Sequence, residues 1–210
     1  HRRMSGGIVG IDVGGTFTDL YFSADGVSVS RVLKVPSTPD DPSRGLVDAL
    51  TTAGIEPDAL DLILHGTTIA TNAVIERKGA NCALITTRGF RDVLELGRRD
   101  RQRPYGLTGA HRPLVPRAQR WEVDERLDHK RNVLKPLDPA EVRALAEVIA
   151  SQNVEAVIVS LLHSYANPEH EQQIAAILRE ANPGWHVTIS SDVVREYYEF
   201  ERTSTAAVQG

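Results

Sequence analysis

The first part of the chain carries three consecutive segments with the hydrophobic pattern of β-strands. Residues 7–13 form an apolar run that contains a single carboxylate, which is typical of a strand buried on both faces. Residues 18–22 and 27–35 flank the turn pair Asp25-Gly26, so they are expected to form a hairpin. The three strands together predict an antiparallel meander.

Strand and helix patterns alternate through the rest of the chain. Capping residues mark two helices: Asp41-Pro42 begins a helix that stops at Gly54, and Asp138-Pro139 begins another. A hairpin is expected over 120–133, with its turn at 128–131. The alternation in the second half predicts βαβ crossovers and a parallel sheet. The other expected elements are strands over 60–64, 83–87, 156–162 and 186–190, and helices over 68–77, 139–150, 169–181 and from 199 onward.

These elements predict an α/β fold in which a mixed sheet, an antiparallel three-strand meander plus parallel strands, is flanked by helices. Residues 1–6 are interpreted as a tag remnant and a disordered start. The expected parts are an N-terminal α/β part over 7–87, an irregular segment and hairpin over 88–135, and a βαβ part over 136–210. The expected buried strand positions are Val9, Ile11, Leu64, Leu84, Ile85, Val157, Ile158, Val159 and Leu161.

Composition and charge exclude several classes of protein. The 210 residues are 41% hydrophobic and 25% charged, which is ordinary for a globular domain. A formal net charge of −4 argues against nucleic acid as a ligand, because basic residues are not in excess. No apolar run is long enough to span a membrane, no signal peptide is recognisable, and the single cysteine, Cys82, indicates a reducing compartment. We therefore expect a cytoplasmic protein without a membrane partner.

The sharpest chemical signal in the sequence is the segment Asp12-Val13-Gly14-Gly15-Thr16-Phe17-Thr18-Asp19. Two glycines after a buried strand permit a tight turn whose backbone amides face outward, and such a turn can cradle a phosphate. The hydroxyls of Thr16 and Thr18 would add donors beside Gly14 and Gly15. Asp12, near the end of the strand, would hold Mg²⁺ through water, because that ion keeps much of its hydration shell.

An ordinary hairpin turn is the alternative interpretation of a bare glycine pair. The segment matches neither the Gly-x-x-x-x-Gly-Lys nor the Gly-x-Gly-x-x-Gly phosphate motif, and a second strand follows it in place of a helix. It resembles instead the first phosphate motif of the sugar kinase, actin and heat-shock ATPase superfamily. That resemblance implies a ribonuclease H-like sheet that forms one lobe of an actin-like ATPase, with the ATP phosphates at Asp12 and the Gly-Gly-Thr turn.

A second motif narrows the resemblance. Residues 65–79 join a short strand to a helix, and with 12–19, 89–95 and 199–205 they make four ordered motifs. Together these motifs resemble the N-terminal region of the hydantoinase A / 5-oxoprolinase family and of the acetone and acetophenone carboxylase subunits. The resemblance covers nearly the whole chain from Ile8 onward.

The second motif offers its own candidate site residues. Gly66, Thr67 and Thr68 precede a helix, so their amides and hydroxyls would bind an anion or a carbonyl oxygen with help from the helix N-terminus. His65 is a candidate proton donor or metal ligand. The alternatives are that Thr67 or Thr68 is only an N-cap and that His65 is a core histidine. Asn72 is either a further pocket residue or a structural amide.

Other charged groups receive no assigned role. The run 98–103, rich in arginine, would contact phosphates or an acidic partner, or would form a solvated loop. Glu199, Glu201 and Arg202 would line a cleft or form a salt-bridge network at the start of a helix. The histidines lack the spacing of a metal site, so a metal cluster built only from these residues is not expected.

The resemblance implies an enzyme that depends on ATP and Mg²⁺ and phosphorylates the carbonyl of a cyclic amide, so that water can open the ring. Two alternatives stay open: an acetone or acetophenone carboxylase-type subunit, and a non-catalytic ATP-binding assembly module. The second phosphate site and the adenosine site are expected in the remainder of the same chain, past Gly210. A hydantoinase B-type subunit or domain is the expected partner, and the 210 residues alone are expected to be inactive.

Overall fold

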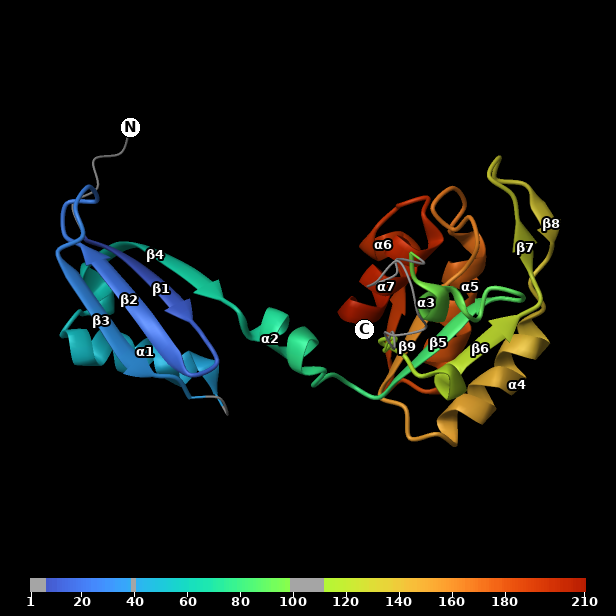
Figure 1. The fold of residues 1–210 in the computed structure, drawn as a ribbon, viewed down its shortest axis with the longest axis horizontal. Coiled ribbons are helices and arrows are strands. Elements are labelled where there is room, and N and C mark those ends of the chain that lie inside the picture. The colour runs from blue at the N-terminus through green and yellow to red at the C-terminus, as the bar shows by residue number, and fades with distance from the viewer. Residues whose placement is uncertain (1–6, 39–40, 99–111) are drawn as a thin grey trace, which may run out of the picture. The chain divides into compact units, whose positions relative to one another are not determined.

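The computed structural model of the protein describes residues 7–38, 41–98 and 112–210 (Figure 1). The chain divides into two compact units, unit 1 (His1–Lys78) and unit 2 (Gly79–Gly210). Each unit has its own sheet and its own buried core. The expected tag remnant at 1–6 lies outside the described residues.

Unit 1 is built on a four-stranded sheet that carries one long helix. Its strands are β1 (Gly7–Val13), β2 (Phe17–Ser23), β3 (Arg31–Pro36) and β4 (Leu60–Thr67), and its helices are α1 (Pro42–Ala53), α2 (Ile69–Glu76) and a 3-10 turn at Pro57–Ala59. The strand order is β3-β2-β1-β4. The pairs β1–β2 and β2–β3 are antiparallel and the pair β1–β4 is parallel. The predicted antiparallel meander is therefore confirmed, and the parallel pairing of β4 with β1 makes the sheet a mixed one.

Local capping signals fix α1 as the sequence predicted. The Asp41 side chain accepts a hydrogen bond from the Ser43 amide, and Gly54 ends the helix with a φ of 63°. The apolar side of α1 packs on one face of the sheet. The core between them consists of Val9, Ile11, Val13, Leu20, Val35, Ala49, Leu50, Ala53 and Ile55.

Two details of unit 1 correct the sequence prediction. The third strand begins at Arg31 and not at Val27, because the Asp25 carboxylate accepts hydrogen bonds from the amides of Val27 and Ser28 and holds these residues in a loop. The prediction that Leu64 is buried was wrong, since its side chain is 55% exposed. Leu64 pairs with Gly10 on the face away from α1, and β4 is the last strand of the sheet.

Unit 2 contains the parallel sheet that the second half of the sequence predicted. Four strands, β5 (Cys82–Thr87), β6 (Arg120–Val123), β9 (Ala156–Ser160) and β10 (His186–Ile189), pair in parallel in the order β10-β9-β5-β6. Because β5 pairs with β6 and β9, it belongs to unit 2. The boundary between the units therefore follows Lys78, whereas the N-terminal part was expected to end at residue 87.

The expected hairpin over 120–133 is only partly correct. Its first segment is β6 of the parallel sheet, and the hairpin itself consists of β7 (Arg126–Leu127) and β8 (Val133–Lys135). The turn lies where it was expected, because the Asp128 carboxylate accepts hydrogen bonds from the amides of Lys130 and Asn132.

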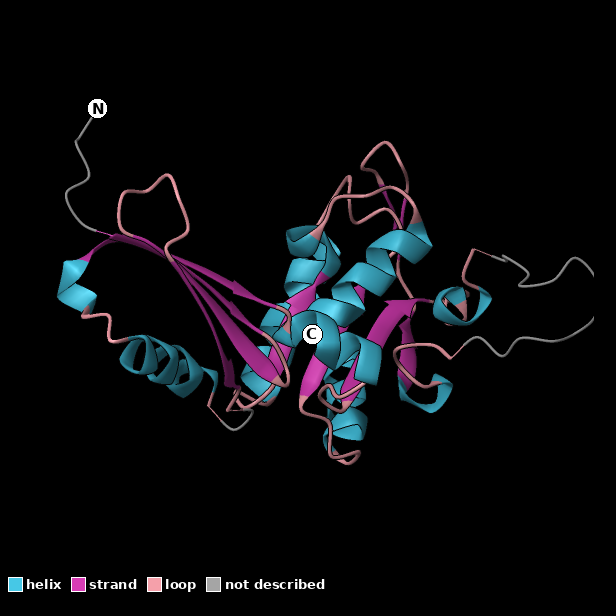
Figure 2. Ribbon diagram, turned by 60° about the vertical axis from the view of Figure 1, so that its left-hand side comes forward, coloured by secondary structure: helices cyan, strands magenta, loops and turns pink. Residues whose placement is uncertain are grey.

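Helices cover both faces of the unit 2 sheet (Figure 2). The helices are α3 (Val93–Leu96), α4 (Pro139–Ala150), α5 (Glu169–Ala181), α6 (Ser190–Val193) and α7 (Glu199–Gln209), with a 3-10 turn at Arg117–Gln119. The helices α4 and α5 pack on one face, and α3 and α7 pack on the other around Leu84 and Ile158. This double cover explains why all five residues of β9 are buried.

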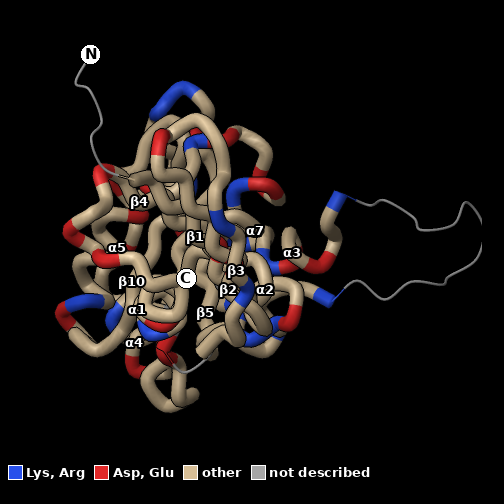
Figure 3. Tube along the Cα trace, turned by 90° about the vertical axis from the view of Figure 1, so that its left-hand side faces the viewer, with Lys and Arg blue, Asp and Glu red and all other residues tan. Residues whose placement is uncertain are grey.

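The formal net charge of the chain is −4. Figure 3 shows acidic and basic residues interspersed along the described chain. Among the described residues, no helix combines the length and apolar character that crossing a bilayer requires.

Candidate functional site

The glycine pair forms the tight turn between β1 and β2. The Gly14 amide donates to the Phe17 carbonyl at 3.0 Å, and the Ser37 amide donates to the Thr16 carbonyl at 2.9 Å. A Cβ on Gly14 would lie 2.9 Å from the Phe17 carbonyl oxygen, so only glycine fits there. Within the described part of the chain, the amides of Gly15 and Thr16 have no hydrogen-bond partner. The turn therefore presents two adjacent backbone donors.

Parallel pairing of β1 with β4 brings the second motif beside this turn. Asp12 pairs with Gly66 and Val13 pairs with Thr67, so both strands end at the same edge of the sheet. A Cβ on Gly66 would lie 3.6 Å from Oδ1 of Asp12. The Thr67 hydroxyl donates to the Val13 carbonyl at 3.2 Å, and the Thr68 amide donates to the same oxygen at 3.3 Å.

The helix α2 starts directly after this contact. Thr68 occupies its N-cap position, but the Thr68 side chain makes no capping hydrogen bond. Its hydroxyl instead accepts a hydrogen bond from Nδ2 of Asn72 at 3.4 Å. The positive end of the α2 dipole is thus left without a side-chain cap, which favours an anion at this end of the sheet.

A cavity of about 370 Å³ borders the carboxylate of Asp12 on the sheet face away from α1. Its size suits a small molecule. Tyr21 and Leu64 give it apolar walls, and glycine at two positions leaves the sheet surface open. The lining residues are Gly10, Ile11, Asp12, Tyr21, Leu64, His65 and Gly66.

The structure does not bring every predicted site residue to this place. Thr18 is fully buried, and its hydroxyl hydrogen-bonds the Ser37 hydroxyl at 3.0 Å, so this predicted ligand-binding hydroxyl has a partner within the protein. Thr18 pairs with Val13, whose side chain packs toward α1. His65 pairs with Ile11 on that same side, so its side chain leaves the sheet on the face opposite the Asp12 side chain, although both Ile11 and His65 border the cavity. This register does not support a joint role for His65 and Asp12.

Comparison with known proteins identifies the family. Residues 8–182 match the family described as the hydantoinase/oxoprolinase N-terminal region. The chain belongs to this family.

Three relatives illustrate the range of the family. An uncharacterized protein of Methanocaldococcus jannaschii is 41% identical over 204 residues, which cover 95% of this chain and 30% of the relative. The caprolactamase subunit alpha of Pseudomonas jessenii is 37% identical over 212 residues, which cover 95% of this chain and 30% of the relative. The solved nucleotide-free structure of acetone carboxylase is 32% identical, with a TM-score of 0.86 over 97% of this chain and 31% of that chain. The chain thus spans about 30% of the length of these two relatives and 18% of the 5-oxoprolinase 1 of Arabidopsis thaliana.

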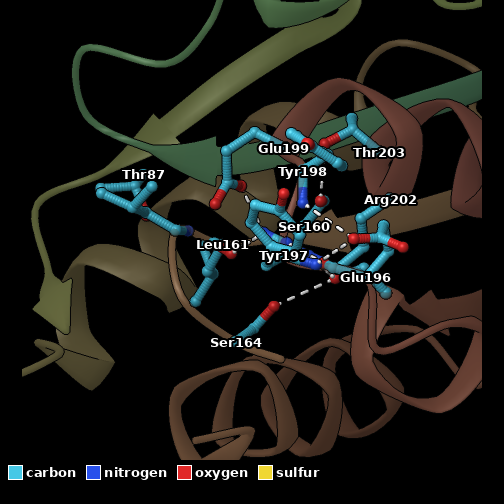
Figure 4. Close-up of polar contacts among 12 residues, drawn as sticks. Thr87, Ser160, Leu161, Ser164, Glu196, Tyr197, Tyr198, Glu199, Arg202 and Thr203 are labelled. Atoms are coloured by element: carbon cyan, nitrogen blue, oxygen red, sulfur yellow. Dashed lines mark hydrogen bonds and ion pairs between the residues drawn. The ribbon is translucent and has the colours of Figure 1, made fainter. Parts of the chain in front are cut away.

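Unit 2 of this hydantoinase/oxoprolinase-family chain holds a second polar cluster, at the carboxyl ends of β9 and β10. Arg202 is fully buried and donates to the carbonyls of Leu161 and Glu196, at 2.8 Å and 2.6 Å, and to the Ser190 hydroxyl at 3.2 Å (Figure 4). It also forms an ion pair with Glu199, whose pKa is raised by burial despite the nearby guanidinium. Each polar atom of Arg202 is engaged by the protein, so this cluster fastens α7 to the sheet.

A buried glutamate completes the same cluster. Glu171 is fully buried and accepts hydrogen bonds from the Leu161 amide at 2.9 Å, the Ser191 amide at 2.9 Å and the Ser190 hydroxyl at 2.6 Å. These three donors compensate the loss of water around its carboxylate. Of the two interpretations of Glu199, Glu201 and Arg202, these contacts match the salt-bridge network.

The remaining candidates divide between surface contacts and residues outside the described part. Arg98 forms an ion pair with Glu201 at 2.7 Å, and residues 99–103 lie outside the described residues. In the described ranges, no group of three or more histidine, cysteine or acidic residues is arranged to hold a metal. His170 instead lies 2.7 Å from the Glu125 carboxylate in the interior of unit 2.

One residue near the turn was missed by sequence reasoning. Asp19 lies directly opposite Asp12 across β1 and β2, which brings a second carboxylate to the open face of the sheet. Lys34 lies 3.2 Å from the Asp19 carboxylate and 5.2 Å from the centre of the Phe17 ring. The signal that could have revealed Asp19 is its position, since a two-residue hairpin turn at Gly15 and Thr16 fixes which residues face each other.

Proposed function

We propose that this chain is the N-terminal, ATP-binding portion of a hydrolase that phosphorylates the carbonyl oxygen of a cyclic amide to open its ring. The observation that carries the proposal is the meeting of the Gly15 and Thr16 amides, the α2 N-terminus and the Asp12 carboxylate at one edge of the sheet. Membership in a family with a caprolactamase subunit supports the choice of a cyclic amide.

The donors at this edge suit the phosphates of ATP. Two neighbouring amides without protein partners can each donate to a phosphate oxygen, and the dipole of α2 adds positive potential. Gly14, Gly15 and Gly66 keep side chains away from the backbone there, which lets a phosphate approach closely. Gly66, Thr67 and Thr68 contribute through backbone position, because the Thr67 and Thr68 hydroxyls have partners within the protein.

The carboxylate of Asp12 suits a hydrated Mg²⁺ ion. Asp12 is exposed on the open face of the sheet, and Mg²⁺ commonly takes one or two carboxylates and keeps several waters. The negative charges of Asp12 and the phosphates would repel each other, and such an ion would neutralise them. ATP would supply the phosphoryl group that makes the carbonyl oxygen a leaving group. The chain itself would orient the phosphates and keep their charge stabilised.

A carboxylase-type activity is the second candidate. It is favoured by the TM-score, which is 0.86 for the acetone carboxylase structure and 0.77 for the caprolactamase structure. In that case the same phosphate site would activate a ketone for carboxylation. The whole enzyme would in either case need the rest of its chain and a hydantoinase B-type partner, and we expect the 210 residues alone to lack turnover.

The test uses the full-length subunit together with its partner. We expect ATP-dependent ring opening of hydantoin or 5-oxoproline and no bicarbonate-dependent carboxylation of acetone. Carboxylation without ring opening would contradict the hydrolase proposal and support the carboxylase-type activity.

A matched pair of variants tests whether the phosphate site drives turnover. Asp12→Ala should abolish ATP-dependent turnover while the thermal unfolding temperature stays unchanged. Asp48→Ala, an exposed carboxylate on α1, should keep full activity. Unchanged turnover of Asp12→Ala would overturn the enzymatic role of the site and favour a module that binds ATP only for assembly.

A further inference from the structure

The side chain of Asn72 lies against the glycine turn. Asn72 sits on the first turn of α2, and a Cβ built on Gly15 would come within 3.3 Å of its Nδ2 atom. The same Nδ2 donates to the Thr68 hydroxyl at 3.4 Å. The residue is partly buried, so one side of its amide group remains accessible.

The chemistry of a carboxamide leaves a donor available in this position. Its NH₂ group carries two hydrogens, and the Thr68 hydroxyl occupies only one of them. The second hydrogen of Nδ2 is therefore left to donate, and Nδ2 borders Gly15. The backbone amide of Gly15 also has no partner in the described chain. A backbone donor and a side-chain donor therefore lie next to each other at Gly15, and neither carries a full charge. An oxyanion with several oxygens is the ligand that satisfies such a set.

We propose that Asn72 binds a phosphate oxygen of the nucleotide through Nδ2, as a side-chain donor that completes the cradle formed by Gly15 and Thr16. This inference rests on the proposed function, because it names a further residue of the same phosphate site. Thr68 has a supporting role, since its hydroxyl holds the Asn72 amide in place.

The proposal also gives Gly15 a specific reason to be glycine. A methyl group at Gly15 would lie 3.3 Å from Nδ2 of Asn72, which is a tight contact, so the amide would have to shift by a few tenths of an ångström. Gly15→Ala should therefore weaken phosphate binding partly through Asn72. The effect of Gly15→Ala should accordingly be smaller when Asn72 has already been replaced by alanine.

The experiment measures the dissociation constants of MgATP and of adenosine for the full-length subunit by titration calorimetry. Asn72→Ala should weaken MgATP binding by about 10-fold to 100-fold, the effect of losing one hydrogen bond to a charged group. Asn72→Asp has the same size but carries a negative charge, so it should weaken MgATP binding further. Ile75→Ala, the same truncation at an exposed position of α2, is the control and should leave binding unchanged.

The outcomes separate this inference from the function on which it rests. Adenosine affinity should stay unchanged in every variant, because adenosine carries no phosphate for Asn72 to bind. An Asn72→Ala subunit that binds MgATP as tightly as the wild type would overturn the inference and leave the proposed function standing. Equal losses for MgATP and adenosine would also overturn it, since they would mean that Asn72 only supports the fold. A wild-type subunit without MgATP affinity would overturn the proposed function itself.

Discussion

Replacing Arg202 by methionine tests whether the buried cluster of unit 2 holds α7 in place. Methionine keeps most of the side-chain volume and removes the charge and every donor. The substitution leaves the carbonyls of Leu161 and Glu196 and the Ser190 hydroxyl without their guanidinium partner. It also leaves Glu199 without its ion-pair partner in a largely buried position.

The expected cost is about 3 to 5 kcal/mol of the free energy of unfolding, the usual result of removing one partner of a buried ion pair. Most of this cost comes from the charge and the acceptors that stay behind, and not from the attraction that is lost. Adding Glu199→Gln to Arg202→Met should therefore recover part of the stability, because the second change removes the uncompensated charge.

Urea denaturation followed by tryptophan fluorescence measures this effect. Both tryptophans of the chain, Trp121 and Trp185, lie in unit 2, so the signal reports on the unit that holds the cluster. Arg143→Met, on the exposed side of α4, is the control and should change stability by less than about 0.5 kcal/mol. A loss below about 1 kcal/mol for Arg202→Met would refute the view that Arg202 anchors α7.

Four further substitutions probe other parts of the structure. Ile158→Ala should cost about 2 to 5 kcal/mol in urea denaturation because Ile158 is fully buried in β9, whereas Leu64→Ala should cost under about 1 kcal/mol. Gly54→Ala should lower the free energy of unfolding by about 1 kcal/mol, because the φ of 63° disfavours a side chain. Denaturation followed by circular dichroism measures this loss. Burial raises the folded-state pKa of Glu199 above its ordinary value of 4.5, so folding favours its protonated form. Stability should therefore fall as the pH rises from 4.5 through the folded-state pKa, and Glu199→Gln should flatten this fall in the unfolding temperature.

Elements with local signals were predicted well from the sequence. The helix after Asp41 and the helix after Asp138 begin as expected, because each aspartate caps its own helix through a nearby amide. Predictions that depended on contacts between segments far apart in the sequence were less accurate. The segment at Arg120 was expected in a hairpin, but it pairs with β5, which lies far from it in the sequence. Leu64 has the pattern of a buried residue, yet its burial depends on what covers the last strand of the sheet.

The candidate site shows the same division between local and distant information. The sequence identified both motifs, and the turn at Gly14 and Gly15 formed as expected because its geometry is local. The direction of side chains was not predictable in the same way. Thr18 and His65 lie on the α1 side of the sheet because their strand partners, Val13 and Ile11, lie there. Such facing depends on the register between strands, which a single sequence does not reveal.

The parallel pairing of β1 with β4 places the two motifs of the candidate site at the same edge of the sheet. By itself the glycine turn offers two free amides, and the α2 N-terminus is one helix end among several in the chain. In a parallel pair the carboxyl ends of both strands lie at the same edge, so Val13 and Thr67 are neighbours. An antiparallel β4 would have carried Thr67 to the opposite edge, about 20 Å away for strands of this length. The crossover through α1 therefore matters to the site as much as the glycines do, because it makes the parallel pairing possible.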